Sequence, residues 1–227
     1  MKHPMRYLTI AGLVVALSAC GAIVAGLIPD QEIDDAFGLD GTEVTASAAG
    51  AAGATATLAT SQLTGSFSAT VDSDGLDDFP AIVRDAARAA SISDVLTIRT
   101  TVEVSAPGNV AFEGSYTITG VSLGFEVFDG ATSVLSQDWS NDALSLTFTG
   151  SAAFDGSDTR GTYSAEVDVP MITLTLTSNQ ASAYFDLLKE PGTYTLTGSI
   201  TLEVEPAFPA DADMTFTLKS LGGELTF

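Results

Sequence analysis

The sequence is poor in cysteine, histidine, tryptophan and basic residues. It contains one cysteine, one histidine and one tryptophan, and its 8 lysines and arginines stand against 29 aspartates and glutamates. A single cysteine cannot form an intramolecular disulfide, so packing must stabilise the fold. A formal charge of −21 argues against binding nucleic acid or an anionic lipid surface by charge. It suits a strongly solvated exterior or a cationic partner.

The N-terminus joins a short basic segment to a long apolar one. Lys2 and Arg6 precede an uncharged run from Tyr7 to Ile28, and small residues lead up to Cys20. A positive segment, an apolar core and small residues before a cleavage point form the layout of a cleavable secretory signal. Because the basic residues stay inside, the rest of the chain is predicted to be exported.

The order Leu17-Ser18-Ala19-Cys20 resembles the lipobox of bacterial lipoproteins. The resemblance implies that residues 1–19 are removed as a signal peptide. It also implies that Cys20, carrying acyl chains such as palmitate, becomes the first residue and the membrane attachment. Several acyl chains on one residue give stable anchoring, since each buried methylene contributes about 0.8 kcal/mol. The same resemblance implies the outer membrane, in a cell that has one, because Gly21 rather than an aspartate follows the cysteine.

Two other interpretations of this segment stay open. In the first, the signal peptide is an ordinary one and Cys20 is incidental. In the second, the segment is kept as a membrane span, because Tyr7 to Ile28 supplies about the 20 apolar residues that cross a bilayer. All three interpretations place the remainder of the chain on the far side of a membrane.

Removal of residues 1–19 would also remove the histidine, His3, and two of the basic residues, leaving a formal charge of −23. Without a histidine or a free thiol, no Ser-His-Asp or Cys-His nucleophile can be assembled. No imidazole or thiolate would remain for zinc, copper, haem or an iron–sulfur cluster. We therefore expect a protein that is not an enzyme and carries no such cofactor.

Residues 20–57 are predicted to form a flexible tether that begins at the lipidated cysteine. The run from Asp30 to Asp35 is acidic, and Ala46 to Thr57 is almost wholly alanine, glycine, threonine and serine. Such a composition buries little apolar surface. We expect it to lift a single domain, residues 58–227, clear of the membrane.

From residue 58 onward apolar and polar residues alternate. Between Thr193 and Glu205 the apolar members are Tyr194, Leu196, Gly198, Ile200, Leu202 and Val204, with threonine, serine or glutamate between them. The same alternation recurs in residues 63–71, 96–104, 110–119, 121–127, 144–148, 163–169, 172–176 and 214–218. Because successive strand residues point to opposite sides, each segment is predicted to have one buried and one wet face.

Short turn sequences separate these segments, among them Asp129-Gly130 and Pro191-Gly192. Short connections imply antiparallel neighbours, and clean alternation argues against parallel strands buried on both faces. The sequence therefore predicts a mainly β domain, an antiparallel curved sheet, sandwich or half-barrel of about nine to eleven strands with two short helices.

The first helix is expected from Phe79, after an Asp78 cap, to about Ala90. The second begins near Gln180, places Ala181, Tyr184, Phe185 and Leu188 on one stripe, and stops at Pro191-Gly192. Both are expected to close an open end or the concave side of the sheet.

The segment Asp72-Ser73-Asp74-Gly75-Leu76-Asp77-Asp78 resembles the opening of calcium-binding loops. Alternate carboxylates and a glycine bend supply the hard oxygen ligands that Ca²⁺ prefers, which makes Asp72, Asp74, Asp77 and Asp78 candidate calcium ligands. Arg84 stands where an EF-hand loop would have its bidentate glutamate. The alternative is an acidic turn that caps the helix at Phe79. Asp155-Gly156-Ser157-Asp158 is interpreted as a hairpin turn.

No motif identifies a specific activity. Glu103, Glu113, Glu126 and Glu166 fall on polar strand faces, and nothing singles out a pair for glycosidase chemistry. We expect a non-catalytic cell-envelope lipoprotein with a structural or protein-interaction role. One alternative is a carrier or chaperone for lipid or another apolar ligand, since several envelope lipoproteins are curved sheets around a greasy cavity. Another is an outer-membrane β-barrel, because residues 221–227 resemble the last strand of such barrels.

Overall fold

Alternating threonine and apolar residues produce long antiparallel strands that curve around a shared core. The computed structural model describes residues 30–48, 60–74, 88–109, 112–177, 179–189 and 191–227. Within these residues the chain forms a twelve-stranded antiparallel sheet and one helix. The mainly β, antiparallel architecture expected from the sequence is confirmed.

The elements follow one another along the chain with mostly short connections. They are β1 (Gln31–Ile33), β2 (Glu43–Ala48), β3 (Ser61–Asp74), β4 (Ser91–Ile98), β5 (Thr101–Pro107), β6 (Phe112–Asp129), β7 (Thr132–Asn141), β8 (Leu146–Phe154), β9 (Asp158–Ala165), β10 (Ile172–Thr177), α4 (Asn179–Leu188), β11 (Pro191–Glu205) and β12 (Asp213–Thr226).

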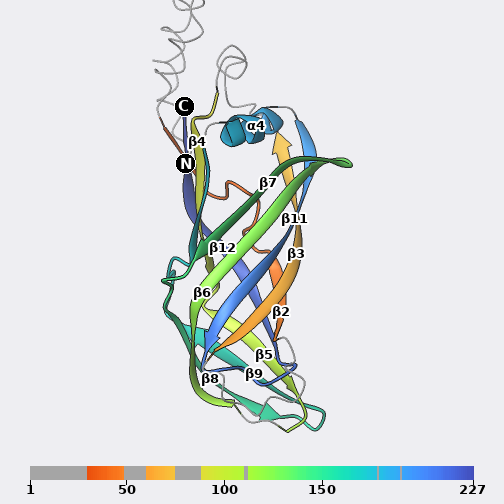
Figure 1. Ribbon diagram of the computed structural model, residues 1–227, viewed down its shortest axis with the longest axis vertical. Coiled ribbons are helices and arrows are strands. Elements are labelled where there is room, and N and C mark those ends of the chain that lie inside the picture. Colours follow the sequence, from red (N-terminus) through yellow and green to blue (C-terminus); the bar gives the residue numbers. More distant parts are fainter. Residues whose placement is uncertain (1–29, 49–59, 75–87, 110–111, 178, 190) are drawn as a thin grey trace, which may run out of the picture.

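Eight strands close into a ring in the lower half of the molecule as drawn in Figure 1. The order is β12-β2-β3-β11-β6-β8-β9-β5, and the ring closes because the first residues of β12 pair with β2 on one side and β5 on the other. An aromatic cluster fills its interior: the ring of Tyr116 lies 5.7, 5.1 and 4.9 Å, centroid to centroid, from the rings of Phe148, Tyr163 and Phe208.

The upper half has two four-stranded layers, β1-β12-β4-β10 and β3-β11-β6-β7. The first layer arises because β12 shifts register after Ser220 and its last residues pair with β4 on one side and β1 on the other. The second arises because the first part of β6 pairs with β8 and its last part pairs with β7. Residues 34–42, which we call the inner segment, contact both layers, and α4 closes the end (Figure 1).

Side chains rather than a backbone ladder join β7 to β10 in the part of the chain that the structure describes. The indole Nε1 of Trp139 donates to the carbonyl oxygen of Thr175 at 3.2 Å, and Asn141 Nδ2 donates to that of Met171 at 2.8 Å. The two layers therefore meet at a seam, and the ring below it is held by backbone hydrogen bonds.

The predicted period of two is confirmed along β11. Tyr194, Leu196, Ile200 and Leu202 are buried, whereas Thr193 and Thr195 are exposed. Gly198 occupies an inward position of the strand, where a Cβ would lie 2.4 Å from the ring of Phe67. The glycine leaves room for that ring beside the strand.

The prediction of a flexible tether over residues 20–57 is wrong for residues 30–48. β1 pairs with β12, β2 pairs with β12 and β3, and Phe37 and Leu39 are fully buried in the inner segment. Small residues such as Ala46 bury little apolar area, but β2 is stabilised by its backbone hydrogen bonds to the strands on either side. These two strands raise the count to twelve, above the expected nine to eleven. Residues 20–29 and 49–57 lie outside the described residues.

The second predicted helix is confirmed as α4, with Ala181, Tyr184 and Phe185 buried. Most of the first, residues 79–87, lies outside the described residues; its expected end is wrong, since residues 88–90 are not helical and lead into β4. The part of the chain with described structure thus has one helix instead of two. No helix in it has the length and apolarity to cross a bilayer.

Candidate functional site

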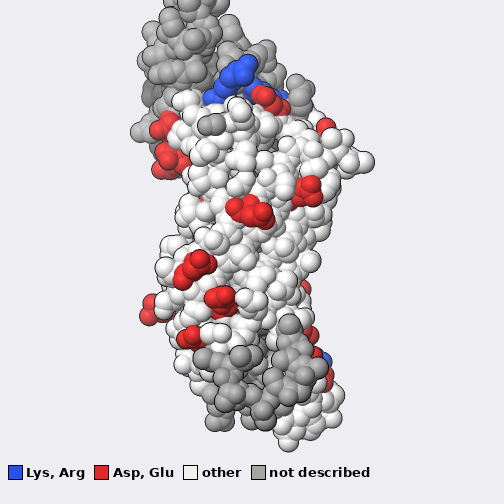
Figure 2. Space-filling model, in the orientation of Figure 1, with Lys and Arg blue, Asp and Glu red and all other residues white. Residues whose placement is uncertain are grey.

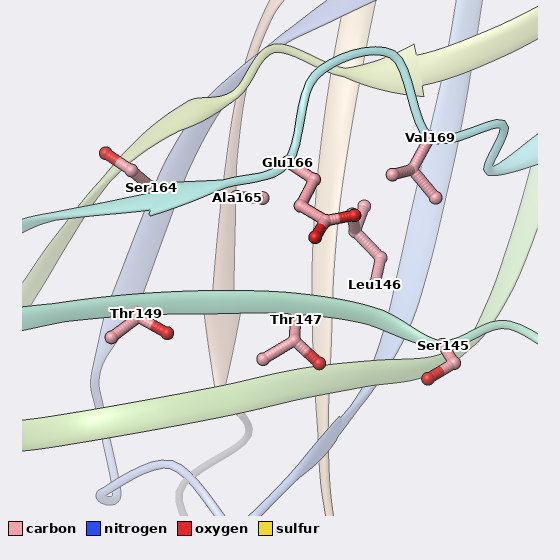
Figure 3. Close-up of a pocket in the computed structure, with 8 residues that line it drawn as sticks. All are labelled: Ser145, Leu146, Thr147, Thr149, Ser164, Ala165, Glu166 and Val169. Atoms are coloured by element: carbon pink, nitrogen blue, oxygen red, sulfur yellow. The ribbon is translucent and has the colours of Figure 1, made fainter.

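A half-open hollow of about 500 Å³ lies on the outer side of the sheet, where the chain paths of β8 and β9 diverge (Figure 3). The two strands pair up to Phe148 and Ala165. From there one path leads back to β7 and the other leads on to β10. The hollow therefore sits where the β7–β10 seam meets the closed ring.

Strand alternation places hydroxyl groups in this hollow. Ser145, Thr147 and Thr149 are exposed and alternate with the buried side chains of Leu146 and Phe148. Ser164 of β9 and Glu166, just beyond its end, complete the polar lining. Figure 3 shows the Glu166 side chain reaching from the β9 path toward Leu146, over the row of threonines.

The lining offers four hydroxyls and one carboxylate, with Leu146, Ala165 and Val169 as its apolar part. It holds no lysine, arginine or aromatic side chain. Thr147 Oγ1 already shares a hydrogen bond of 2.8 Å with Thr117 Oγ1. A carboxylate accepts hydrogen bonds only, and hydroxyls accept as well as donate. The hollow thus suits an uncharged or cationic group rich in donors.

The four candidate calcium ligands are only partly within the described residues. Asp72 is an exposed residue of β3, where its Oδ1 accepts a hydrogen bond of 2.9 Å from Thr193 Oγ1. Asp74 ends β3, while Asp77 and Asp78 lie outside the described residues. Among the residues that are described, no three of the histidines, cysteines, aspartates and glutamates are placed to hold a metal ion. Calcium binding stays a prediction.

The interpretation of residues 155–158 as a turn is confirmed. Asp155 Oδ1 accepts hydrogen bonds from the backbone N–H groups of Ser157 and Asp158, at 2.9 and 3.1 Å, and from the Ser157 hydroxyl. These donors, with Arg160 nearby, lower the pKa of Asp155 to about 2. The carboxylate therefore orders the hairpin between β8 and β9.

Asp94 is a buried acid that the sequence interpretation missed. Its carboxyl group accepts from the backbone N–H of Ala36 in the inner segment and lies 2.6 Å from the hydroxyl of Ser220 in β12. Asp94 has the same parity along β4 as Ile92 and Leu96, both inward. This parity could have identified Asp94 from the sequence as a buried acid, since a charged residue at an inward position of a strand needs hydrogen-bond or ion-pair partners.

Trp139 lies within β7 and is partly buried. Its ring centroid is 4.9 Å from that of Phe125 and 6.2 Å from that of Phe37. The residue joins the inner segment, the β6 core face and, through its indole nitrogen, the seam. The lipidation residue Cys20 lies outside the described residues.

No protein-family profile and no curated protein matches this chain. Among solved structures, it is matched with the CBM2 module of Lactobacillus casei BL23 phage J-1 evolved Dit at 13% identity and a TM-score of 0.19, over 72% of this chain and 70% of that one. A structure of infectious bursal disease virus Gx strain matches at 14% identity and a TM-score of 0.12, over 87% and 42%. Both scores are too low to carry an argument about fold or function.

Proposed function

We propose that this chain is a non-catalytic lipoprotein of the cell envelope that binds a partner protein through its outer sheet face. The observation that carries the proposal is the run of short hydroxyl side chains on the outside of a filled core. Hydroxyls of neighbouring strands pair directly: Thr64 with Thr201 at 3.1 Å, and Thr45 with Thr215 at 3.0 Å.

Such a face is suited to contact with a partner because serine and threonine lose less rotamer entropy on burial than lysine, arginine or glutamate. The cross-strand hydrogen bonds order them further before any partner arrives. A preorganised polar surface reduces the entropic cost of association.

The core offers little support for a carrier of apolar ligands. Rings of Tyr116, Phe148, Tyr163 and Phe208 pack together in the ring half, and Phe37, Phe125, Trp139 and Tyr184 do so in the layered half. The described hollow lies outside this core and is lined by hydroxyls. These features favour the interaction role.

We assign the partner contact to the hollow at Glu166, and the partner surface there is basic. Glu166 is exposed in a lining without a cation, and carboxylates are spread over the face that Figure 2 shows. A net charge of −21 attracts a cationic surface and slows the approach of anionic ones.

The anchor is tested with Cys20→Ser in the full chain. The natural full chain should incorporate labelled palmitate and Cys20→Ser should not, because the Cys20 thiol is the proposed acylation site. No incorporation into the natural chain, or equal incorporation into Cys20→Ser, would contradict the lipoprotein assignment.

The contact is tested by photo-crosslinking in the producing cells, with a photoreactive residue at Ser145 on the rim of the hollow and, as a control, at Thr195 on β11. Position 145 should give one discrete adduct that weakens severalfold in about 0.5 M NaCl and in Glu166→Gln, because screening and charge removal weaken an ion pair. Glu43→Gln, on β2 away from the hollow, should leave the adduct unchanged. Equal adducts at positions 145 and 195 would contradict the assignment.

A further inference from the structure

The side chain of Asp94 is fully buried in the upper half of the molecule, between two strands and the inner segment. In the sheet Asp94 lies opposite Leu174 of β10 on one side and Gly223 of β12 on the other. Its Oδ2 accepts a hydrogen bond of 3.0 Å from the backbone N–H of Ala36, and its Oδ1 lies 2.6 Å from Ser220 Oγ.

Ser220 occupies the register shift of β12 and has more than one partner. Its Oγ also lies 2.6 Å from the backbone carbonyl oxygen of Asp34 and accepts a hydrogen bond from the N–H of Gly222 at 3.2 Å. A serine hydroxyl has one proton to donate and two lone pairs to accept with. Two oxygens at 2.6 Å therefore compete for a single proton.

Counting protons resolves this competition. The Asp34 carbonyl can only accept, so Ser220 donates to it, and the close contact to Asp94 Oδ1 then needs a proton on the carboxyl group. With that proton, Asp94 donates to Ser220, Ser220 donates to Asp34, and Asp94 Oδ2 still accepts from Ala36. Every donor and acceptor in the chain of hydrogen bonds is satisfied. Without it, either the carbonyl or the carboxylate faces an oxygen lone pair.

We propose that Asp94 and Ser220 form a proton-dependent latch on the inner segment, closed when Asp94 is protonated and loosened when it ionises. The latch grips the segment at Asp34 and Ala36, on either side of Asp35. Directly beyond them the side chain of Phe37 packs against Phe125, Trp139 and Tyr184, and the Tyr184 hydroxyl donates to the Ala36 carbonyl. Release of the latch therefore changes the contacts between the two layers.

The nearby charge that favours the neutral form of Asp94 is the carboxylate of Asp35. On the inner segment, the carboxylate of Asp35 accepts from the N–H groups of Leu39 and Asp40, and Asp40 accepts from the N–H of Ser220. On α4 the facing group is the Tyr184 hydroxyl, and on β10 it is the apolar Leu174. On β12, Lys219 pairs with Asp168 and Glu224 is exposed. No lysine or arginine among the described residues is recorded in contact with Asp94.

Burial raises the pKa of Asp94 from its ordinary value of 3.8 to about 6. The charge of Asp35 also raises this pKa, while the hydrogen bonds that Asp94 shares with Ser220 and with backbone N–H groups lower it. The folded protein thus binds one proton more than the unfolded chain between these two values. The stability that this proton confers is fully present below pH 3.8 and is lost as the pH rises through about 6.

Trp139 reports on the latch, because it is the single tryptophan of the chain and its ring lies 6.2 Å from that of Phe37. The experiment is a titration of tryptophan emission of the full chain in detergent micelles, from about pH 4.5 to 8. We expect a reversible shift with a midpoint near 6. Asp94→Asn should remove the transition, and Asp155→Asn, in the exposed hairpin turn, should keep it. A flat titration of the natural protein, or the same transition in Asp94→Asn, overturns the proposal.

A second measurement does not depend on how Asp94→Asn folds. In the natural full chain labelled at aspartate carboxyl carbons, nuclear magnetic resonance should show one aspartate that titrates near pH 6, with the same midpoint as the emission change. If no aspartate titrates above about pH 5, well above the ordinary range of the residue, the latch is contradicted.

Discussion

Two buried tyrosines differ in what their hydroxyl groups contact, and this difference sets their contributions to stability. The hydroxyl of Tyr184 donates to the carbonyl oxygen of Ala36 at 2.9 Å. The hydroxyl of Tyr116 is buried without a hydrogen-bond partner among the described residues. Burial raises the pKa of both phenols above the ordinary value, so both stay neutral near pH 7.

Replacing each tyrosine by phenylalanine separates the two cases. Tyr184→Phe should lower the free energy of unfolding by about 1–2 kcal/mol, because it leaves a buried carbonyl unsatisfied. Tyr116→Phe should leave that free energy unchanged or raise it by about 1 kcal/mol, because it removes an unpaired buried hydroxyl. Urea unfolding of the two variants at pH 7 measures the difference. Equal losses would show that Tyr116 has a partner in solution.

Among the elements, the inner segment links the two layers of the upper half. Phe37 is fully buried, and its ring lies 5.3 and 5.4 Å from those of Phe125 and Tyr184. Phe37→Ala should therefore cost about 3–5 kcal/mol of unfolding free energy, the usual range for a large buried ring. It should also shift Trp139 emission toward that of a solvated indole.

The matched control is Phe154→Ala at the end of β8, where the side chain is 48% exposed. That substitution should change the unfolding free energy by no more than about 0.5 kcal/mol. If both variants lose the same amount, the inner segment does not pack between the layers as described.

At the scale of the whole molecule, charge opposes the compact state. The formal charge is −21, and Figure 2 shows carboxylates distributed along the visible face with little basic surface between them. The ion pairs recorded in the described part involve Arg160, Lys189 and Lys219. Most of the acidic surface therefore repels itself, over a distance that salt shortens.

Raising NaCl from about 10 mM to about 0.5 M should increase the thermal midpoint of the full chain, because the screening length falls from about 30 Å to a few ångströms. KCl at equal ionic strength should act alike, since screening depends on ionic strength and not on the ion. A midpoint independent of salt would show that bound cations already neutralise the surface.

The sequence by itself determined the antiparallel β class, the buried face of strands such as β11 and the helix at α4, because these follow from local periodicity. Along β11, polar residues such as Thr193 and apolar residues such as Tyr194 alternate in the sequence itself. The buried face of this strand could therefore be predicted without the fold. For residues 30–48 the composition led to the wrong prediction of a tether. These residues form strands because β2 pairs with β12, which lies some 170 residues further along the chain.

Only the tertiary structure decided the ring closure, the hollow at Glu166 and the neighbours of Asp94. β12 pairs with four strands, and no local pattern encodes which of them it meets on each side of Ser220. Asp94 is separated from Ala36 by 58 positions and from Ser220 by 126. Such neighbours decide whether a carboxyl group is protonated at a given pH, because burial and nearby charges shift its pKa from the ordinary value of the residue type.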